Sequence, residues 1–245
     1  MNVPIDKDER IEDLQCNNLK IIQNKNFYTF TSDSVVLANF IKLKAKDVCA
    51  EIGAGCGVIS VLLSAKTNFS KIYAFELQDE MAALAEKNVI LNDLQEKITV
   101  ISDDVRNFSQ HIERCSLDVV FSNPPYMKSD TTLNSNSVRS QARHDVSLPI
   151  DDLCKTATDM LKFGGRFYVV FTASRTAELV YTLMQNNLEP KRIFFTENGR
   201  GKVVLVVIEA VKGGKHGVEV LPNLVTNDQT GEYLKLLQTK YFGRK

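Results

Sequence analysis

The stretch Leu-Asp-Val-Val-Phe-Ser-Asn-Pro-Pro-Tyr, residues 117–126, decides the fold of this 245-residue chain. Its first six residues form an apolar run rich in β-branched and aromatic side chains, which predicts a buried parallel strand. Neither Pro124 nor Pro125 has an N–H group, so strand pairing ends there. Ligands of open α/β sheets bind beyond the carboxyl ends of the strands. We therefore expect Asn123 and Tyr126 to border a ligand site.

These residues suit the recognition of a planar amine. The side-chain oxygen of Asn123 and the main-chain carbonyl of Pro124 can each accept one hydrogen of an exocyclic NH2 group. Tyr126 can stack on the ring that carries the amine. The alternative is structural: a Pro-Pro turn that ends a strand, with the tyrosine in ordinary packing.

The rest of the sequence alternates between strand-like and helix-like segments. Strands are predicted over 48–52, 71–75, 97–101, 117–122, 166–171, 191–195 and 203–209, and helices over 34–43, 57–65, 79–91, 151–162 and 175–186. We expect Gly164-Gly165 to end the fourth of these helices. The order predicts an α/β fold: a single Rossmann-like doubly wound sheet of about seven strands, mostly parallel, with a C-terminal antiparallel strand.

The N-terminal region has a weaker pattern. We expect residues 1–18 to be loose or edge-forming, and a weak strand over 19–23 to pair with 27–30 as a small hairpin or lid. Residues 1–45 then form a cap that belongs to the same domain as the core, residues 46–245.

A glycine-rich turn follows the first core strand. Gly53, Gly55 and Gly57 alternate with other residues, and Glu51 stands two positions ahead of the first glycine. Glycine permits a tight turn and the close approach of a ligand to the backbone. Position 58 is valine, so the third glycine of a dinucleotide fingerprint is absent. The turn therefore favours a ligand that needs no pyrophosphate clamp, and a purely structural turn is the alternative.

Acidic residues follow the next two strands. Glu76 ends the second strand, where an acid can accept hydrogen bonds from both hydroxyls of a ribose. Asp103 and Asp104 follow the third strand, and one of them, by our choice Asp104, can accept a hydrogen bond from an adenine amino group. The alternatives are a solvated acid and a helix N-cap. Together with the glycine turn, the acids describe a ligand with a ribose and an adenine.

Composition excludes several classes of protein. The 30 basic and 30 acidic residues cancel, so overall charge does not indicate a nucleic-acid partner. Residues 191–245 hold ten basic and five acidic residues, which fits a contact to a polyanion or a solvated surface equally well. The five cysteines include no Cys-x-x-Cys pair, so neither disulfides nor a metal site is expected. Without a signal peptide or an apolar run of about 18 residues, we expect a cytoplasmic monomer that binds no membrane.

Together these motifs resemble those of the class I S-adenosylmethionine-dependent methyltransferases. The turn from Glu51 to Gly57 is similar to their first motif, Glu76 to their ribose-binding acid, and Asp104 to their adenine-contacting acid. The sequence over 123–126 is similar to the Asn-Pro-Pro-Tyr motif of the branch that methylates planar nitrogens of adenine, cytosine or glutamine. The resemblance implies S-adenosylmethionine as cofactor and S-adenosylhomocysteine as product.

A narrower resemblance, over roughly 14–236, is to the bacterial valine-tRNA adenine-N6 methyltransferases. Its segments are 30–38, 142–145, 164–168, 190–192, 212–217 and 221–224. It implies that the partner is tRNA and that the substrate is the adenosine 3′ of the anticodon in valine tRNA.

Each candidate residue has an expected role. The catalytic residues are Asn123, Pro124, Pro125 and Tyr126. The residues that bind the methyl donor are Asp33, Glu51, Gly53, Gly55, Gly57, Glu76, Leu77, Asp104, Val105 and Asn123. The long loop over 127–149 carries the substrate-side residues Lys128, Arg139, Arg143 and His144, with a solvated polar loop as the alternative.

Three other functions stay open. A glutamine-N5 methyltransferase shares the Asn-Pro-Pro-Tyr motif but usually has a helical N-terminal domain, for which 1–45 is too short. A DNA adenine-N6 methyltransferase usually has a separate target-recognition domain, and none is visible. A catalytically inactive nucleotide-binding module that binds RNA would have no reason to keep the motif intact.

Overall fold

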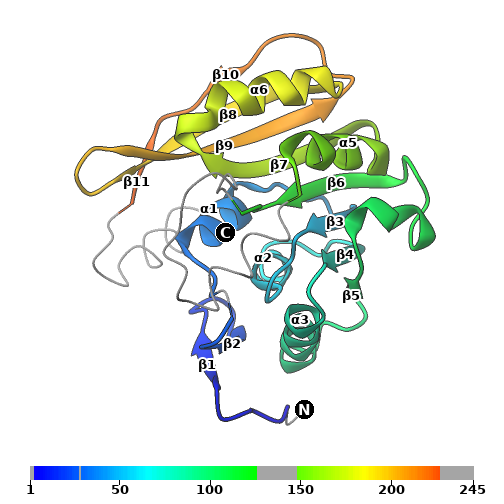
Figure 1. Ribbon diagram of the computed structural model, residues 1–245, viewed down its shortest axis with the longest axis vertical. Helices are drawn as coiled ribbons and strands as arrows, with labels where there is room; N and C mark the ends of the chain where they lie inside the picture. The colour runs from blue at the N-terminus through cyan, green and yellow to red at the C-terminus, as the bar shows by residue number, and fades with distance from the viewer. Residues whose placement is uncertain (1–2, 28, 126–147, 227–245) are drawn as a thin grey trace, which may run out of the picture.

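The structure is a computed structural model that describes residues 3–27, 29–125 and 148–226. Figure 1 shows one twisted sheet with helices on both faces and a small hairpin at the N-terminal end. The elements in chain order are β1 (Glu9–Asp13), β2 (Lys20–Asn24), α1 (Ser32–Phe40), β3 (Val48–Ile52), α2 (Val58–Ser64), β4 (Lys71–Glu76), α3 (Asp79–Leu91), β5 (Ile98–Ser102), η1 (Val105–Gln110), β6 (Leu117–Ser122), α5 (Ile150–Met160), β7 (Leu161–Thr172), η2 (Ala173–Arg175), α6 (Thr176–Gln185), β8 (Leu188–Asn198), β9 (Val203–Lys212), β10 (Glu219–Val220) and β11 (Leu224–Thr226).

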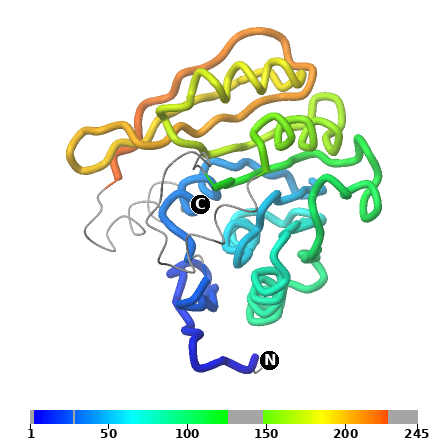
Figure 2. The backbone as a smooth tube through the Cα atoms, viewed as in Figure 1, coloured from blue at the N-terminus to red at the C-terminus, as the bar shows by residue number. Residues whose placement is uncertain are grey.

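The large sheet has the order β10-β8-β9-β7-β6-β3-β4-β5, and β11 also pairs with β8. Figure 2 shows the course of the chain, from the blue N-terminal hairpin to the orange C-terminal segments at the opposite end of the molecule. β3 pairs in parallel with β4 and β6, and β9 is antiparallel to both β7 and β8. This confirms the predicted α/β fold. The predicted seven strands are the long ones, and the short β10 and β11 extend the edge beside β8.

Two apolar cores lie on opposite faces of the sheet. Val119 and Phe121 of β6 belong to the core that includes α1, α2 and α3, whereas Val120 belongs to the core that includes α5 and α6. This alternation follows from the two-residue period of a strand. All three side chains are fully buried, and each contributes about 1.5–3 kcal/mol by leaving water. β6 is therefore a rigid central strand, from which Asn123 emerges.

The N-terminal hairpin differs from the prediction. β2 is where we expected it, but its partner is β1, in the acidic segment that we expected to be loose or edge-forming, and not the segment over 27–30. Residues 27, 29 and 30 form no strand. The charges of β1 have partners: Lys87 of α3 donates to Glu9 at 2.9 Å, and Gln23 of β2 donates to Glu12 at 2.5 Å. These contacts join residues far apart in sequence, so the local pattern did not indicate them.

The predicted helix end at Gly164-Gly165 is wrong. α5 ends at Met160, and the glycine pair lies inside β7. Gly164 has a φ of +77°, and the pairing of β6 with β7 shifts register at this level. A Cβ at Gly165 would stand 2.9 Å from the carbonyl oxygen of Lys162. The glycines therefore permit an irregular start of the strand.

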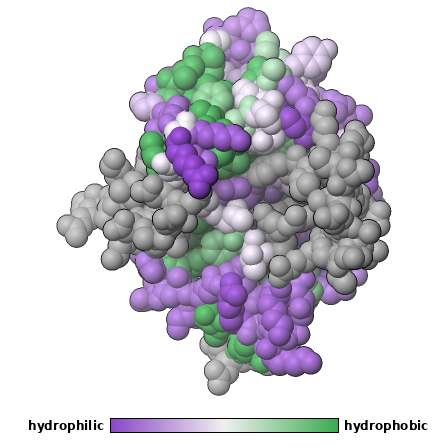
Figure 3. Space-filling model, turned by 60° about the vertical axis from the view of Figure 1, so that its left-hand side comes forward, coloured by the Kyte–Doolittle hydropathy of each residue, from purple (hydrophilic) through white to green (hydrophobic). Residues whose placement is uncertain are grey.

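Apolar side chains are unevenly distributed over the surface that Figure 3 shows. The upper part of the view in Figure 3, which holds β8 and β9, shows more apolar surface than the lower part. Scattered apolar side chains on a surface are ordinary. Within the described ranges, no helix has both the length and the apolar character that crossing a bilayer requires.

Candidate active site

The carboxyl ends of three neighbouring strands meet at one edge of the sheet. Ile52 at the end of β3 is in register with Phe75 of β4 on one side and with Ser122 of β6 on the other. Ser122 also donates its hydroxyl hydrogen to the carbonyl of Ile52 at 2.8 Å. The glycine turn follows β3, Glu76 is the last residue of β4, and Asn123 follows β6, so the fold brings three of the predicted motifs together.

The glycine turn has the geometry that the sequence predicts. Gly53, Gly55 and Gly57 have φ values of +72°, +56° and +78°, in the left-handed region that favours glycine. Among the described residues other than Gly53 and its two chain neighbours, no atom lies within 4 Å of the position that a Cβ would take at Gly53. At Gly57 a Cβ would meet Ala85 of α3 at 3.4 Å. Gly53 therefore leaves its backbone open to a ligand, while Gly57 permits close helix packing.

Glu51 lies beneath this turn. Its carboxylate is buried and accepts hydrogen bonds from the backbone N–H of Ser60, at 3.2 Å, and from the Ser60 hydroxyl. Burial raises the pKa of Glu51 to about 8. The contact joins the end of β3 to the first turns of α2, and it gives Glu51 a structural role. Its predicted contact with a methyl donor stays a prediction.

Glu76 stands beside the turn. One carboxylate oxygen accepts a hydrogen bond from the N–H of Gly55 at 2.7 Å, and the other accepts from Gln78 at 3.0 Å. Each carboxylate oxygen has a second lone pair, so these contacts leave capacity for hydroxyl donors. Leu77, the next residue, exposes its apolar side chain. The arrangement is compatible with a ribose between Glu76 and Gly53.

Asp103 and Asp104 both have partners in the structure. Asp104 accepts from the N–H of Arg106 at 2.9 Å and caps η1, as the capping alternative predicted. Its side chain also bonds to the Arg106 guanidinium, which lowers its pKa. The carboxylate of Asp103 lies 2.7 Å from the His111 ring, and this hydrogen bond lowers its pKa. A contact of either acid with adenine, beside the buried Val105, stays a prediction.

Asn123 projects from the end of β6, and the structure gives it a partner that the sequence did not indicate. Its Nδ2 donates to the hydroxyl oxygen of Ser34, in the first turn of α1, at 3.0 Å. Pro124 is buried and Pro125 is exposed. Asp33, beside Ser34, accepts from the Ser32 hydroxyl at 3.3 Å. Since Ser34 and Asn123 are 89 residues apart, only the tertiary structure identifies Ser34 as part of this site.

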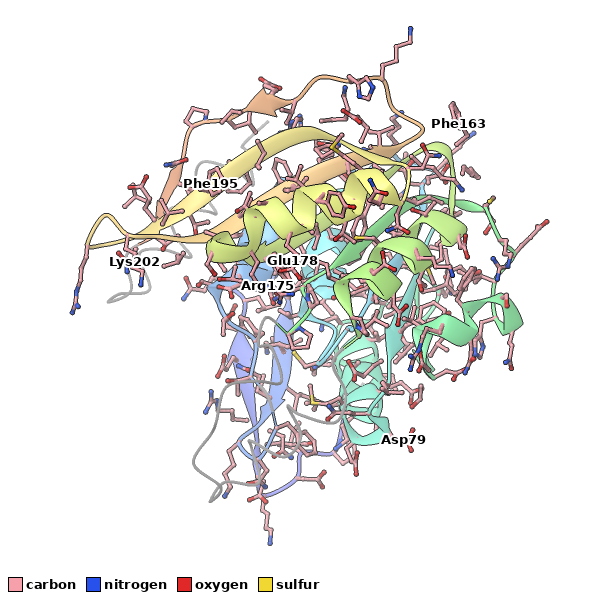
Figure 4. The ribbon with its side chains drawn as sticks, turned by 45° about the horizontal axis from the view of Figure 1, so that its top comes forward. Asp79, Phe163, Arg175, Glu178, Phe195 and Lys202 are labelled. Carbon is pink, nitrogen blue, oxygen red and sulfur yellow. The ribbon has the colours of Figure 1, made fainter. Side chains whose placement is uncertain are left out.

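Arg175 is a cation next to the same edge of the sheet, where η2 follows β7. It forms a two-pronged ion pair with Glu178, with N···O distances of 2.8 and 2.6 Å (Figure 4). The pair neutralises the charge of Arg175, so we do not count this residue among the candidates for phosphate contacts.

Several predicted residues lie outside the described ranges. They are Tyr126, Lys128, Arg139, Arg143 and His144. Their roles stay predictions. In the described part of the chain, no three His, Cys, Asp or Glu side chains are grouped so as to hold a metal ion.

Comparison with known proteins identifies the family. The family described as "Methyltransferase small domain" matches residues 29–199, which is more than half of the chain. The chain belongs to this family. The methyltransferase motifs that the sequence resembles, from Glu51 to Pro125, lie within the matched range, so the resemblance to methyltransferases is confirmed.

Curated relatives of this methyltransferase have specific names. A Bacteroides fragilis protein named tRNA1(Val) (adenine(37)-N6)-methyltransferase is 25% identical over 86% of this chain and 89% of its own length. A Photorhabdus laumondii protein of the same name is 32% identical over 57% of each chain.

Solved structures support the fold of the methyltransferase. An Agrobacterium tumefaciens protein described as a predicted O-methyltransferase has a TM-score of 0.65 and 18% identity, covering 85% of this chain and 98% of its own. Geranyl diphosphate C-methyltransferase from Streptomyces coelicolor has a TM-score of 0.54 and 11% identity, covering 74% of this chain and 75% of its own. At these identities the likeness concerns the fold alone.

Proposed function

We propose that this methyltransferase transfers the methyl group of S-adenosylmethionine to N6 of an adenosine in tRNA, the purine 3′ of the anticodon in valine tRNA. The observation that carries the proposal is the position of Asn123. Its side-chain amide follows β6 at the sheet edge where the open backbone of Gly53 and the carboxylate of Glu76 also stand. The names of the curated relatives support the choice of substrate.

In this proposal the methyl donor lies across the ends of β3, β4 and β5. Gly53 and Gly55 approach the donor through their backbone, and Glu76 accepts hydrogen bonds from the ribose hydroxyls. Asp104 or Asp103 binds the adenine, and Glu51 supports the turn from below. The Streptomyces structure was solved with S-adenosyl-L-homocysteine, which supports a donor of this class in the shared fold.

The transfer requires an oriented amine. Asn123 Oδ1 and the Pro124 carbonyl oxygen each accept one hydrogen of the adenine NH2 group, which turns the nitrogen lone pair towards the methyl carbon. The N6–CH3 bond forms as the S–CH3 bond of the sulfonium breaks, and S-adenosylhomocysteine leaves. The methylated nitrogen then loses one proton to water, so no side chain has to act as a general base. Positioning and polarisation supply most of the catalysis.

The target base must leave its stack before its amino group can enter the site. An anticodon loop is single-stranded, so this costs less than it would in a duplex. Tyr126 stacks on the extruded adenine, and the basic residues Lys128, Arg139, Arg143 and His144 contact RNA phosphates. We also propose that the enzyme acts as a monomer in the cytoplasm, with 1–45 as a cap on the domain over 46–245.

The test is a methyl-transfer assay with purified protein and labelled S-adenosylmethionine. Unmodified valine tRNA, the same tRNA with guanosine 3′ of the anticodon, duplex DNA and a protein release factor are offered separately. We expect N6-methyladenosine in the first substrate alone after digestion to nucleosides. Methylation of glutamine in the release factor, or of DNA, or equal labelling of both tRNAs, would contradict the proposal.

A further inference from the structure

Ser34 lies where it can control the amide of Asn123. Its side chain is buried in the first turn of α1, with 5% of its surface exposed, and its hydroxyl oxygen accepts a hydrogen bond from Asn123 Nδ2 at 3.0 Å. Asn123 follows the central strand β6, whereas Ser34 belongs to the N-terminal cap. The contact therefore joins the cap to the residue on which the proposed chemistry depends.

The start of α1 is held in place through the N-terminal hairpin. Gln23 of β2 is buried, and its side-chain oxygen accepts a hydrogen bond from the N–H of Phe30 at 3.2 Å. The Gln23 amide nitrogen in turn donates to Glu12 of β1. The hairpin thus positions the chain four residues before Ser34.

The end of α1 is held by two cations from the core. Lys66 donates to the carbonyl oxygens of Ala38 and Asn39, at 2.6 and 2.7 Å. Arg166 of β7 donates to the Lys42 carbonyl and to Asp47, the latter at 2.6 Å. Since both ends of the helix are anchored, the Ser34 hydroxyl has a defined position before any substrate binds.

The orientation of the Asn123 amide decides whether it can act. The oxygen and nitrogen ends of an amide have nearly the same shape, and the terminal side-chain torsion permits both orientations. Only the oxygen accepts hydrogen bonds, and the nitrogen would present a donor to another donor, the adenine NH2 group. In the structure Nδ2 is the end that contacts Ser34, so Oδ1 is the end directed away from Ser34, as the proposed chemistry requires.

We infer that Ser34 is a positioning residue for methyl transfer: by accepting the Nδ2–H of Asn123, it directs Oδ1 of Asn123 to the amine of the substrate. The inference rests on the proposed function. A merely structural role for Ser34, in which its hydroxyl only helps to dock α1 onto β6, makes a different prediction. It would lower stability and donor binding without acting specifically through Asn123.

The experiment compares Ser34→Ala with the wild-type protein and with Ser64→Ala. The Ser64 hydroxyl donates to the carbonyl of Val61 within α2 and has no contact with Asn123, which makes it a matched control. We expect Ser34→Ala to lower kcat by about 10- to 100-fold, as losing a supporting partner of a reacting group commonly does. The Kd of S-adenosylmethionine should change less than about twofold, and Ser64→Ala should keep the wild-type kcat.

A double-mutant cycle with Asn123→Ala separates the two roles of Ser34. In single-turnover measurements with excess enzyme, Ser34→Ala should cause almost no further loss once Asn123 is gone. An equal loss in both backgrounds, or a wild-type kcat in Ser34→Ala, would overturn the inference. Both results presuppose that the wild-type protein methylates tRNA. Failure of the wild-type protein to do so overturns the proposed function, and is seen before any variant is made.

Discussion

The carboxylate of Glu76 accepts a hydrogen bond of 2.7 Å from the backbone N–H of Gly55. This contact ties the end of β4 to the glycine turn that follows β3. The same carboxylate is the candidate partner of the donor ribose, so one side chain both shapes the turn and faces the proposed ligand.

We expect Glu76→Ala to weaken binding of S-adenosylmethionine by about 10- to 100-fold, because hydrogen bonds to a charged group contribute about 1.5–3 kcal/mol. Isothermal titration calorimetry measures the effect. Glu86→Ala, on an exposed position of α3, is the control and should bind as the wild-type protein does. Unchanged affinity in Glu76→Ala would place the ribose elsewhere.

Asn123→Ala should separate catalysis from donor binding. We expect kcat to fall by about 100- to 1000-fold, since an oriented polar group at the reacting centre is lost. The Kd of S-adenosylmethionine should stay within about twofold of the wild-type value. Rapid-quench kinetics with tRNA and calorimetry with the donor measure the two quantities. A parallel loss of donor affinity would show that the amide binds the donor rather than the target amine.

The buried carboxyl group of Glu51 predicts a pH-dependent stability. Its pKa is about 8 in the folded protein and about 4.5 in the unfolded chain, because burial disfavours the charged form. Between these values the folded state binds more protons, so the free energy of unfolding should fall as pH rises from about 4.5 to 8. Glu51→Gln has no proton to lose in this pH range, so it gains no buried charge. We expect its thermal midpoint to equal that of the wild-type protein near pH 4.5 and to exceed it near pH 8.5. If the thermal midpoints of the wild-type protein and Glu51→Gln changed by the same amount from about pH 4.5 to 8.5, the raised pKa of Glu51 would be wrong.

Asn88 and Asn92 attach strand β2 of the N-terminal hairpin to α3 and to the residue that follows it. Asn88 is fully buried, accepts from the N–H of Ile22 at 2.6 Å, and donates to the carbonyls of Ile22 and Cys56 at 3.0 and 2.9 Å. Asn92 makes similar bonds to Lys20, one helical turn later, near solvent.

Asn88→Ala should therefore destabilise the protein much more than Asn92→Ala does. Each buried backbone group left without a partner costs about 1–3 kcal/mol, whereas water can replace the amide at Lys20. Urea unfolding measures the difference, and hydrogen exchange over 20–24 locates it. Equal destabilisation by the two substitutions would argue against this attachment of β2.

Much of the fold and part of the site could be predicted from local sequence. The strand over 117–122 and the helix over 79–91 have the predicted bounds, because alternation and helical spacing repeat within each segment. The glycine turn was predictable because residues other than glycine rarely adopt positive φ values, so closely spaced glycines indicate such a turn. The N-terminal strand pairing and the glycine pair in β7 were not, because the partner of a strand is set by distant segments.

The sequence alone determined the order of strands and helices and the residue types at each strand end, since periodicity and turn chemistry act over a few neighbouring residues. Only the tertiary structure decided which of those residues touch. It placed Ser34 against Asn123, put Glu51 beneath the turn, and set the His111 ring against Asp103. These contacts depend on how the sheet and helices pack, and packing brings together residues that no local pattern connects.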